Sequence, residues 1–238
     1  VHGAGIHILE GYGLTETSPV IAVNSFERVK IGTVGHVLDN LDVKIQADGE
    51  ITVKGPSVFQ GYYKDDEKTK EAFTEDGYFM TGDIGHIDEE GFLHITDRKK
   101  EMFKTSGGKY VAPQVLENLA KGSKFIEQIM VVGDGEKMPC ALVQPDYAFA
   151  KLWAERKHLK IGKTPEEMAN SPELKARIMK DINLLNATLG KWEQIKKIEL
   201  TPTLWTIEDG LLTPTMKLKR KAVKEKFFNL YEKLYDRA

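Results

Sequence analysis

The chain changes character at the charged stretch Thr96-Asp97-Arg98-Lys99-Lys100. Before this stretch, short runs of alternating apolar and polar residues are separated by glycines, as is typical of strands. After it, helical spacing prevails. Four formal charges in five residues are unfavourable in a core, so we expect this stretch to be exposed and able to bend. The sequence therefore predicts two packed units, 1–96 and 97–238, joined either by a plain solvated linker or by a hinge that also meets a ligand.

Bulk properties exclude several classes of protein. The chain has 238 residues, of which 41% are hydrophobic and 29% charged, with a net charge of −2, so we expect a soluble globular protein with no nucleic-acid partner. The single cysteine, Cys140, excludes an intramolecular disulfide and fits a reducing, cytoplasmic compartment. No apolar run approaches the ~18 residues that a membrane span needs. The start at Val1, inside an apolar strand pattern, indicates part of a longer protein.

A glycine-bracketed motif near the start carries the first candidate site. The apolar run Gly5–Glu10 predicts a buried strand that leads into Gly11-Tyr12-Gly13-Leu14-Thr15-Glu16-Thr17. Glycines on both sides of an aromatic residue let the backbone turn tightly and approach a ligand. The Thr15 hydroxyl can bond a phosphate oxygen, and the Glu16 carboxylate can hold Mg²⁺. The same residues also fit an alternative without a ligand, namely an ordinary turn after a strand with a capping threonine.

Two hairpins are expected in the first unit. Their strands are residues 42–47 and 50–54, which flank Asp48-Gly49, and residues 85–88 and 92–95, which flank Glu89-Glu90-Gly91. Asp48-Gly49 is a strong hairpin signal. It predicts a turn in which both of these residues have positive φ. Such hairpins predict a small antiparallel barrel or curved sheet. The charged run 64–73 between them predicts a helix.

Thr81-Gly82-Asp83 stands just before the second hairpin. A carboxylate on a glycine turn can accept two hydrogen bonds from the vicinal hydroxyls of a ribose. The commoner use of Gly-Asp is an Asx-turn, and the letters alone do not separate the two interpretations.

The second unit is expected to mix helices and strands. Helices are predicted from Pro113 to about Lys121, over 146–158 and from Ser171 to about Gly190. Paired strands are predicted at 128–132 and 141–144. A C-terminal helix is predicted with an apolar stripe from Val223 to Leu234. Trp192 and Trp205 are expected to pack in the core. Thr105-Ser106-Gly107-Gly108-Lys109 predicts a flexible polar loop. The basic run Lys217–Lys226 is expected to be a solvated face, or to meet phosphates or a membrane surface.

The order of these motifs resembles the adenylate-forming superfamily of acyl-CoA synthetases, luciferases and peptide adenylation domains. The resemblance covers nearly the whole chain. Three of its pieces are Gly11–Glu16, Thr81-Gly82-Asp83 and Asp97-Arg98-Lys99, and residues 105–117 and 212–220 resemble long-chain fatty acyl-CoA synthetases in particular. The resemblance implies an α+β fold, with a small antiparallel barrel-like lobe that belongs to the large adenylation domain and a separate, mobile α+β C-terminal lobe. It also implies the substrates ATP, a long-chain fatty acid and CoA, with AMP as a product and Mg²⁺ as cofactor.

The resemblance assigns roles residue by residue. Near the nucleotide it places Tyr12 by the adenine, Thr15 at the phosphate, Glu16 at Mg²⁺, and Asp83 and Arg98 at the ribose, and it counts Gly13 among the residues that bind the nucleotide. It makes Asp97 the pivot between lobes and Lys217 the catalytic lysine of adenylation, and it places Gly107 and Gly108 beside the pantetheine of CoA. Much of the superfamily has glycine before that lysine, where this chain has Met216.

The phosphate-binding loop and most of the acyl pocket, which the family carries upstream, are not in this sequence, so we expect the 238-residue chain to be inactive alone. Two alternatives stay open. A related enzyme that adenylates another carboxylate would share the nucleotide residues but not the CoA step. A non-catalytic nucleotide-binding module would bind ATP without releasing pyrophosphate.

Overall fold

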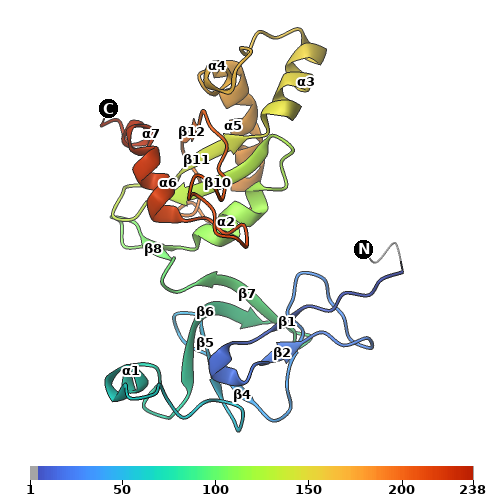
Figure 1. Ribbon diagram of the computed structural model, residues 1–238, viewed down its shortest axis with the longest axis vertical. Coiled ribbons are helices and arrows are strands. Elements are labelled where there is room, and N and C mark those ends of the chain that lie inside the picture. Colours follow the sequence, from blue (N-terminus) through green and yellow to red (C-terminus); the bar gives the residue numbers. More distant parts are fainter. Residues whose placement is uncertain (1–4, 238) are drawn as a thin grey trace. The chain divides into compact units, whose positions relative to one another are not determined.

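The computed structural model describes residues 5–237 and divides the chain into two compact units, Val1–Glu101 and Met102–Ala238. Figure 1 traces the elements of both units. The division falls slightly after the position predicted from the charged stretch. Asp97 is 1% exposed and lies in strand β7 (Leu93–Arg98), so the expectation that the whole stretch is exposed is wrong at this residue. The ladder with β6 continues through Asp97, whose backbone lies opposite Ile84.

A curled antiparallel sheet of four strands is the frame of unit 1. Its strands, in spatial order, are β4 (Asp42–Ile45), β5 (Glu50–Lys54), β6 (Phe79–Ile87) and β7. Both predicted hairpins are present, and the predicted barrel-like unit is confirmed as a half-barrel. The register shifts between Glu50 and Thr52 and between Ile84 and Gly85. Such bulges bend a sheet and re-aim side chains near them.

The β4–β5 turn differs from the prediction in one detail. Gly49 has a φ of +87°, but Asp48 is not among the described residues with positive φ. The amide of Gly49 donates to the carbonyl of Gln46 at 2.8 Å, and the amide of Gln46 donates to the carbonyl of Glu50 at 2.9 Å. These bonds close a three-residue loop that ends in a left-handed glycine, a common hairpin loop. The prediction of two positive-φ positions is therefore wrong.

A second, smaller sheet of unit 1 contains β1 (Gly11–Tyr12), β2 (Ala22–Val23) and β3 (His36–Val37). The buried strand predicted at Gly5–Glu10 is not formed, and Ile6 and Ile8 are 59% and 52% exposed. No strand within residues 5–237 pairs with this segment. An alternating apolar pattern needs a neighbour to satisfy its backbone groups before it becomes a strand.

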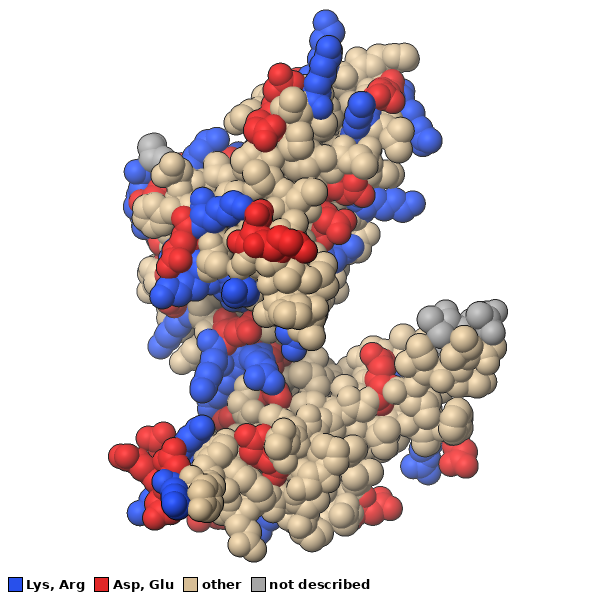
Figure 2. All heavy atoms as spheres, in the orientation of Figure 1, with Lys and Arg blue, Asp and Glu red and all other residues tan. Residues whose placement is uncertain are grey.

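Helix α1 (Asp66–Glu71) confirms the helix predicted between the hairpins, although it is shorter than expected. The Asp65 side chain caps it by accepting a hydrogen bond from the amide of Lys68 at 3.1 Å. None of its residues is buried, and Figure 2 shows both signs of charge over this part of unit 1. The core of the unit lies instead at the sheets, where the buried side chains are Ile21, Ala22, Ile51, Val53, Phe79 and Leu93.

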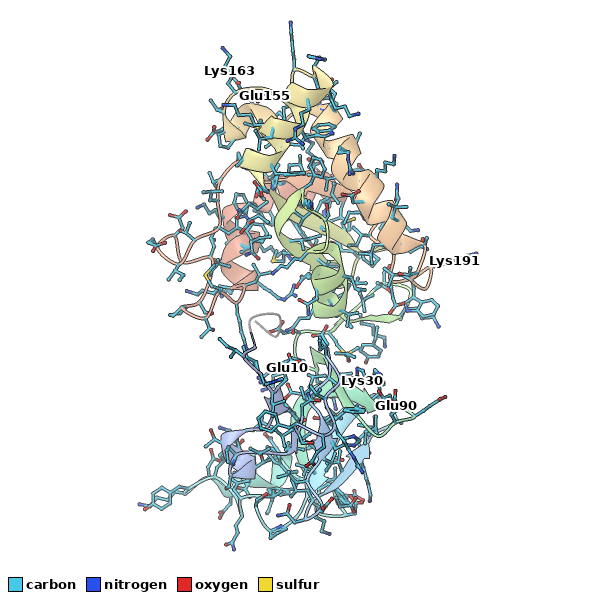
Figure 3. All side chains as sticks on the ribbon, turned by 90° about the vertical axis from the view of Figure 1, so that its right-hand side faces the viewer. Glu10, Lys30, Glu90, Glu155, Lys163 and Lys191 are labelled. Carbon is cyan, nitrogen blue, oxygen red and sulfur yellow. The ribbon has the colours of Figure 1, made fainter. Side chains whose placement is uncertain are left out.

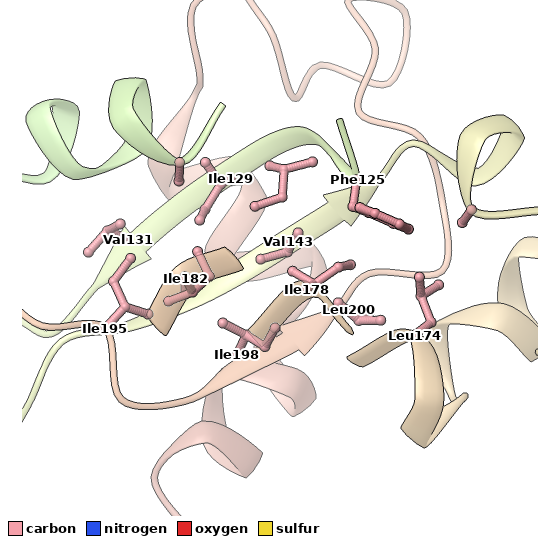
Figure 4. Close-up of a cluster of buried hydrophobic side chains, with 14 of the residues drawn as sticks. Phe125, Ile129, Val131, Val143, Leu174, Ile178, Ile182, Ile195, Ile198 and Leu200 are labelled. Atoms are coloured by element: carbon pink, nitrogen blue, oxygen red, sulfur yellow. The ribbon is translucent and has the colours of Figure 1, made fainter. Parts of the chain in front are cut away.

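Unit 2 is built on a three-stranded sheet with helices on both faces. Strand β11 (Cys140–Pro145) is central, antiparallel to β10 (Ile126–Val132) and parallel to β12 (Ile198–Leu200). Because side chains alternate along a strand, the two faces carry different residues. One face presents Ile129, Val131 and Val143 to helices α2 (Pro113–Ala120) and α5 (Pro172–Asn186), as Figure 4 shows.

The opposite face of that sheet packs on the C-terminal helices, α6 (Arg220–Lys226) and α7 (Phe228–Leu234). Met130, Cys140 and Leu142 lie there with Trp205. Cys140 is fully buried, as expected of a small core residue, and burial raises the pKa of its thiol. The remaining elements of the unit are β8 (Phe103–Lys104), β9 (Tyr110–Val111), α3 (Tyr147–Lys157) and α4 (Pro165–Ala169).

Three expectations for unit 2 are wrong in detail. Trp192 is 48% exposed and does not belong to a core cluster. Helix α5 ends at Asn186, short of Gly190, because the Asn186 side chain turns to bond both backbone groups of Ile195 at 2.9 Å. The apolar stripe of the terminal helix is shared by α6 and α7, which are separated at Phe227, with φ −110° and ψ 32°. Across residues 5–237, no helix has the length and hydropathy that crossing a bilayer requires.

Candidate active site

Three of the predicted nucleotide residues meet around one buried carboxylate. The phenol of Tyr12 donates to Oδ2 of Asp83 at 2.6 Å, and Nε of Arg98 lies 3.0 Å from Oδ1. The Asp83 side chain is 4% exposed, whereas that of Arg98 is 57% exposed. Burial, and then the hydrogen bond to Asp83, raise the pKa of the Tyr12 phenol above its ordinary value. Tyr12 therefore stays protonated and donates to Asp83 throughout the physiological pH range.

The turn before Asp83 fixes where this carboxylate points. Gly82 has a φ of +72°, a left-handed conformation that favours glycine. The Thr81 hydroxyl donates to the carbonyl of Ile51 at 2.7 Å and accepts from the amide of Asp83 at 3.1 Å. Asp83 is then followed by the β-bulge of β6, and its backbone lies opposite Arg98 in β7. Sheet register therefore places the carboxylate beside the guanidinium.

Glu16 and Arg98 line the same hollow of unit 1, which has a volume of about 530 Å³. The hollow is bordered by Leu14, Glu16, Glu50, Tyr62, Lys68, Glu71, Ala72, Phe79, Met80, Thr81, Gly82, Arg98, Lys99 and Lys100. The Tyr62 phenol donates to Oε1 of Glu16 at 3.1 Å, and its pKa is raised by burial and by that carboxylate. One carboxylate oxygen of Glu16 is thus held by Tyr62. The other can face a cation that arrives with a phosphate.

Thr15 and Gly13 occupy the loop between β1 and the short 3₁₀ helix Thr15–Thr17. Thr15 is exposed at the start of that helix and does not border the hollow. A Cβ atom at Gly13 would lie 1.7 Å from the carbonyl oxygen of Pro19, so the chain's own packing requires glycine here. Thr17, which sequence reasoning passed over, is buried, and its hydroxyl bonds the carbonyls of Leu14 and Pro19 at 3.0 and 2.9 Å. Thr17 therefore fixes the shape of the loop that carries Thr15 and Glu16.

The predicted pivot, Asp97, has a defined local contact. The amide of Arg98 donates to its Oδ1 at 2.6 Å. Asp97 is the last buried residue of β7, and Arg98 to Lys100 are exposed. Its position near the end of unit 1 is compatible with a hinge, which stays a prediction.

The site residues of unit 2 lie in two turns. Lys217 follows Met216, which adopts a φ of +61° and is 56% exposed. The turn is closed by the amide of Thr213, which donates to the carbonyl of Lys217 at 2.8 Å, and the Lys217 side chain is exposed. Gly107 and Gly108 lie in the loop between β8 and β9, where Gly108 has a φ of +78°.

A larger hollow of unit 2, about 570 Å³ in volume, contains none of the predicted site residues. It lies beside α2 and α5 and is bordered mainly by apolar side chains, with Ser123, Lys124, Arg177 and Asp181 among them. The Ser123 hydroxyl donates to Asp181 at 2.6 Å, and Arg177 pairs with the same carboxylate. Of the predicted site residues, Glu16 and Arg98 border the hollow of unit 1, and Asp83 pairs with Arg98.

Comparison with known families finds matches in both units of the chain. Residues 101–238 match the model described as AMP-binding enzyme C-terminal domain, and residues 1–63 match AMP-binding enzyme. The chain belongs to the AMP-binding enzyme family. The resemblance found in the motifs is confirmed, since this chain is also 43% identical to a long-chain-fatty-acid–CoA ligase of Mycobacterium tuberculosis over 99% of its length. It is 38% identical to long-chain-fatty-acid–CoA ligase 6 of Rattus norvegicus over 97% of its length.

This AMP-binding chain spans 39% of the mycobacterial relative and 35% of the rat one. Solved structures are similar over nearly the whole chain. The adenylation domain of a carboxylate reductase from Mycobacterium chelonae superposes with a TM-score of 0.71 at 25% identity, covering 98% of this chain and 35% of that one. ATP-bound MatB from Rhodopseudomonas palustris gives 0.68 at 27% identity, covering 95% and 42%.

Proposed function

We propose that this chain is the C-terminal part of a long-chain fatty acid–CoA ligase. In the first step the fatty carboxylate attacks the α-phosphate of ATP, a C–O–P linkage forms, and pyrophosphate leaves. In the second step the CoA thiol attacks the acyl carbon, AMP leaves, and the thiol proton passes to solvent. The observation that carries the proposal is the contact of Tyr12 and Arg98 with the buried carboxylate of Asp83, since Arg98 also borders the hollow that holds Glu16.

Asp83 is proposed to bind the ribose. A buried carboxylate accepts hydrogen bonds strongly, and vicinal hydroxyls offer two donors at the right spacing. Tyr12 and Arg98 already hold one oxygen each, which fixes the rotamer before the nucleotide arrives. Fixed polar groups lose little freedom on binding, so the site is pre-organised.

Glu16 is proposed to meet the Mg²⁺ that accompanies the phosphates, with Thr15 bonding a phosphate oxygen. Among residues 5–237, no group of three metal-binding side chains forms a cage. A single carboxylate fits Mg²⁺ nonetheless, since this ion keeps several waters and is commonly held by one or two carboxylates plus phosphate. When bound, Mg²⁺ supplies positive charge at the phosphates. Glu16 supplies one fixed oxygen, oriented by Tyr62.

Lys217 is proposed to stabilise the negative charge that develops at the α-phosphate, which is worth roughly 3–4 kcal/mol for one well-placed donor. The loop with Gly107 and Gly108 is proposed to lie beside the pantetheine of CoA in the second step. One site cannot receive both Lys217 and the thiol, so the C-terminal unit is proposed to rotate about Asp97 between steps. We also propose a cytoplasmic location. The buried single thiol Cys140 and the basic run from Lys217 support this location and a peripheral contact with a membrane surface.

The test uses the full-length protein that contains this chain. Palmitate-dependent release of pyrophosphate and AMP from ATP, followed by formation of palmitoyl-CoA, is the expected result. Asp83→Asn should raise the KM for ATP roughly 10- to 100-fold, the usual worth of hydrogen bonds to a charged acceptor. The 238-residue chain alone should form no palmitoyl-CoA. ATP binding without pyrophosphate release would favour a non-catalytic module, and pyrophosphate release with no thioester would favour another adenylating enzyme.

A further inference from the structure

Glu50 is a buried carboxylate that the predicted site does not include. It opens strand β5, is 4% exposed and borders the hollow that holds Glu16 and Arg98. Its Oε1 accepts a hydrogen bond from the amide of Gly82 at 3.0 Å, and its Oε2 lies 2.6 Å from Nζ of Lys99. One oxygen of Glu50 therefore binds the residue before Asp83, and the other binds the residue after Arg98.

Two hydrogen bonds hold the peptide groups of Gly82. Glu50 binds its amide, and the backbone amide of Lys99 donates to its carbonyl at 2.8 Å. Gly82 is the residue before Asp83, and its left-handed backbone sets the direction in which that carboxylate leaves the strand. Loss of either contact would allow the turn to move and carry Asp83 with it.

Lys99 links three segments of unit 1. Besides Glu50, its ammonium lies 2.8 Å from Oδ2 of Asp48 in the β4–β5 turn. Its backbone continues β7 directly beyond Arg98, the other partner of Asp83. An ion pair at an exposed position contributes little to stability, but the Glu50 side chain of the Lys99–Glu50 pair is only 5% exposed. Removing the ammonium would leave a buried carboxylate without its cation.

We infer that Glu50 and Lys99 are positioning residues that hold Asp83 and Arg98 at the ribose of the nucleotide. The inference rests on the proposed function, because it takes Asp83 as the ribose-binding carboxylate. Neither residue needs to touch the nucleotide. They act through the Gly82 peptide and the end of β7, so their loss should weaken recognition of the ribose hydroxyls more than it slows the chemical steps.

Unit 1 offers a matched control. Lys30 also bridges two carboxylates, Asp88 and Glu90, each at 2.7 Å, and Figure 3 labels Lys30 and Glu90. Its side chain is 37% exposed, against 45% for Lys99. Lys30→Met therefore removes a lysine of similar exposure from two carboxylates of the other hairpin, Asp88 and Glu90, which are 18% and 69% exposed and have no link to Gly82.

The experiment measures the KM for ATP and the preference for ATP over 3′-deoxy-ATP in the full-length protein. Glu50→Ala should raise the KM roughly tenfold or more, because small misplacements of binding groups have effects of this size. The preference for the ribose hydroxyl should fall toward one, and kcat should change less than the KM. Glu50→Gln, which keeps an acceptor for the Gly82 amide, should recover part of the loss. Lys99→Met should show the same changes at smaller size, and Lys30→Met should match the wild type.

An unchanged KM and an unchanged preference in Glu50→Ala and Lys99→Met would overturn the inference, as would equal changes in Lys30→Met. If Glu50→Ala does not fold, Glu50→Gln and Lys99→Met give the same decision, since each breaks the Glu50–Lys99 pair. A wild type without turnover would instead refute the proposed function. In that case, calorimetric titration of the same variants with AMP and 3′-deoxy-AMP still tests the positioning role.

Discussion

Breaking the pair formed by Glu117 and Arg220 should clearly destabilise unit 2. Arg220 binds both oxygens of Glu117 at 2.8 and 2.7 Å and also donates to the carbonyl of Val131 at 3.2 Å. The amide of Val131 donates to Glu117 at 2.7 Å, so α2, β10 and α6 meet at one carboxylate. Arg220 is the first residue of α6, where the helix dipole disfavours a cation. The contact with Glu117 offsets that disadvantage.

Arg220→Met removes the cation and keeps much of the apolar stem. Breaking a buried pair typically costs about 3–5 kcal/mol, because one charge stays buried without compensation. The side chains here are 6% and 25% exposed, and Glu117 keeps its bond to Val131, so the lower end of that range applies. We expect a loss of about 3 kcal/mol. For a unit of this size, that loss lowers Tm by roughly 6–12 °C.

Urea unfolding followed by tryptophan fluorescence measures this loss, because all three tryptophans, Trp153, Trp192 and Trp205, lie in unit 2. Lys221→Met is the matched control on the same helix, since its side chain is 91% exposed and lies 3.9 Å from Glu225. That variant should change the free energy of unfolding by less than about 0.5 kcal/mol. A loss below about 1 kcal/mol for Arg220→Met, or strict additivity with Glu117→Gln, would refute the reasoning.

Two further predictions concern pH and backbone strain. The pKa of Asp48 is lowered by Lys99, and that of Lys99 is raised by Asp48 and then Glu50. The stability that the ion pair gains from the charge of Asp48 is present above the ordinary pKa of about 3.9 and is lost as pH falls through the lowered pKa. The stability that it gains from the charge of Lys99 is present below the ordinary pKa of about 10.4 and is lost as pH rises through the raised pKa. The calorimetric Tm difference between wild type and Lys99→Met should therefore be constant from about pH 5 to 9 and shrink outside that range; a steady drift within it would contradict the pairing. Met216→Gly should stabilise unit 2 by about 0.5–1 kcal/mol in urea, because glycine accepts the φ of +61°, whereas Met216→Ala should give no gain.

Local signals in the sequence predicted local structure well. Asp48-Gly49 marked a hairpin, Pro113 began α2, and Ser171 caps α5, because turn and cap chemistry acts over a few residues. For Asp83, the ribose-binding role comes from the family resemblance of its motif and stays a prediction. Its contact with Tyr12 spans 71 positions of sequence and depends on how the two sheets fold.

Contacts that no local pattern encodes were missed. Lys99 meets Glu50 across 49 positions, and Arg220 meets Glu117 across 103. Sheet register brings the first pair together and helix packing the second, so charge alone could not identify the partners. The wrong prediction at Gly5–Glu10 has the same origin. Its alternation is real, but a strand also requires a neighbour.

Lys217 is proposed to act in only one of the two steps. In the full-length protein, Lys217→Ala should abolish fatty-acid-dependent exchange of pyrophosphate into ATP, because adenylation loses its cation at the α-phosphate. The same variant should still convert supplied palmitoyl-adenylate and CoA to palmitoyl-CoA at close to the wild-type rate. Equal loss of both half-reactions, or full retention of both, would contradict the role given to Lys217 and the alternation between steps that it implies.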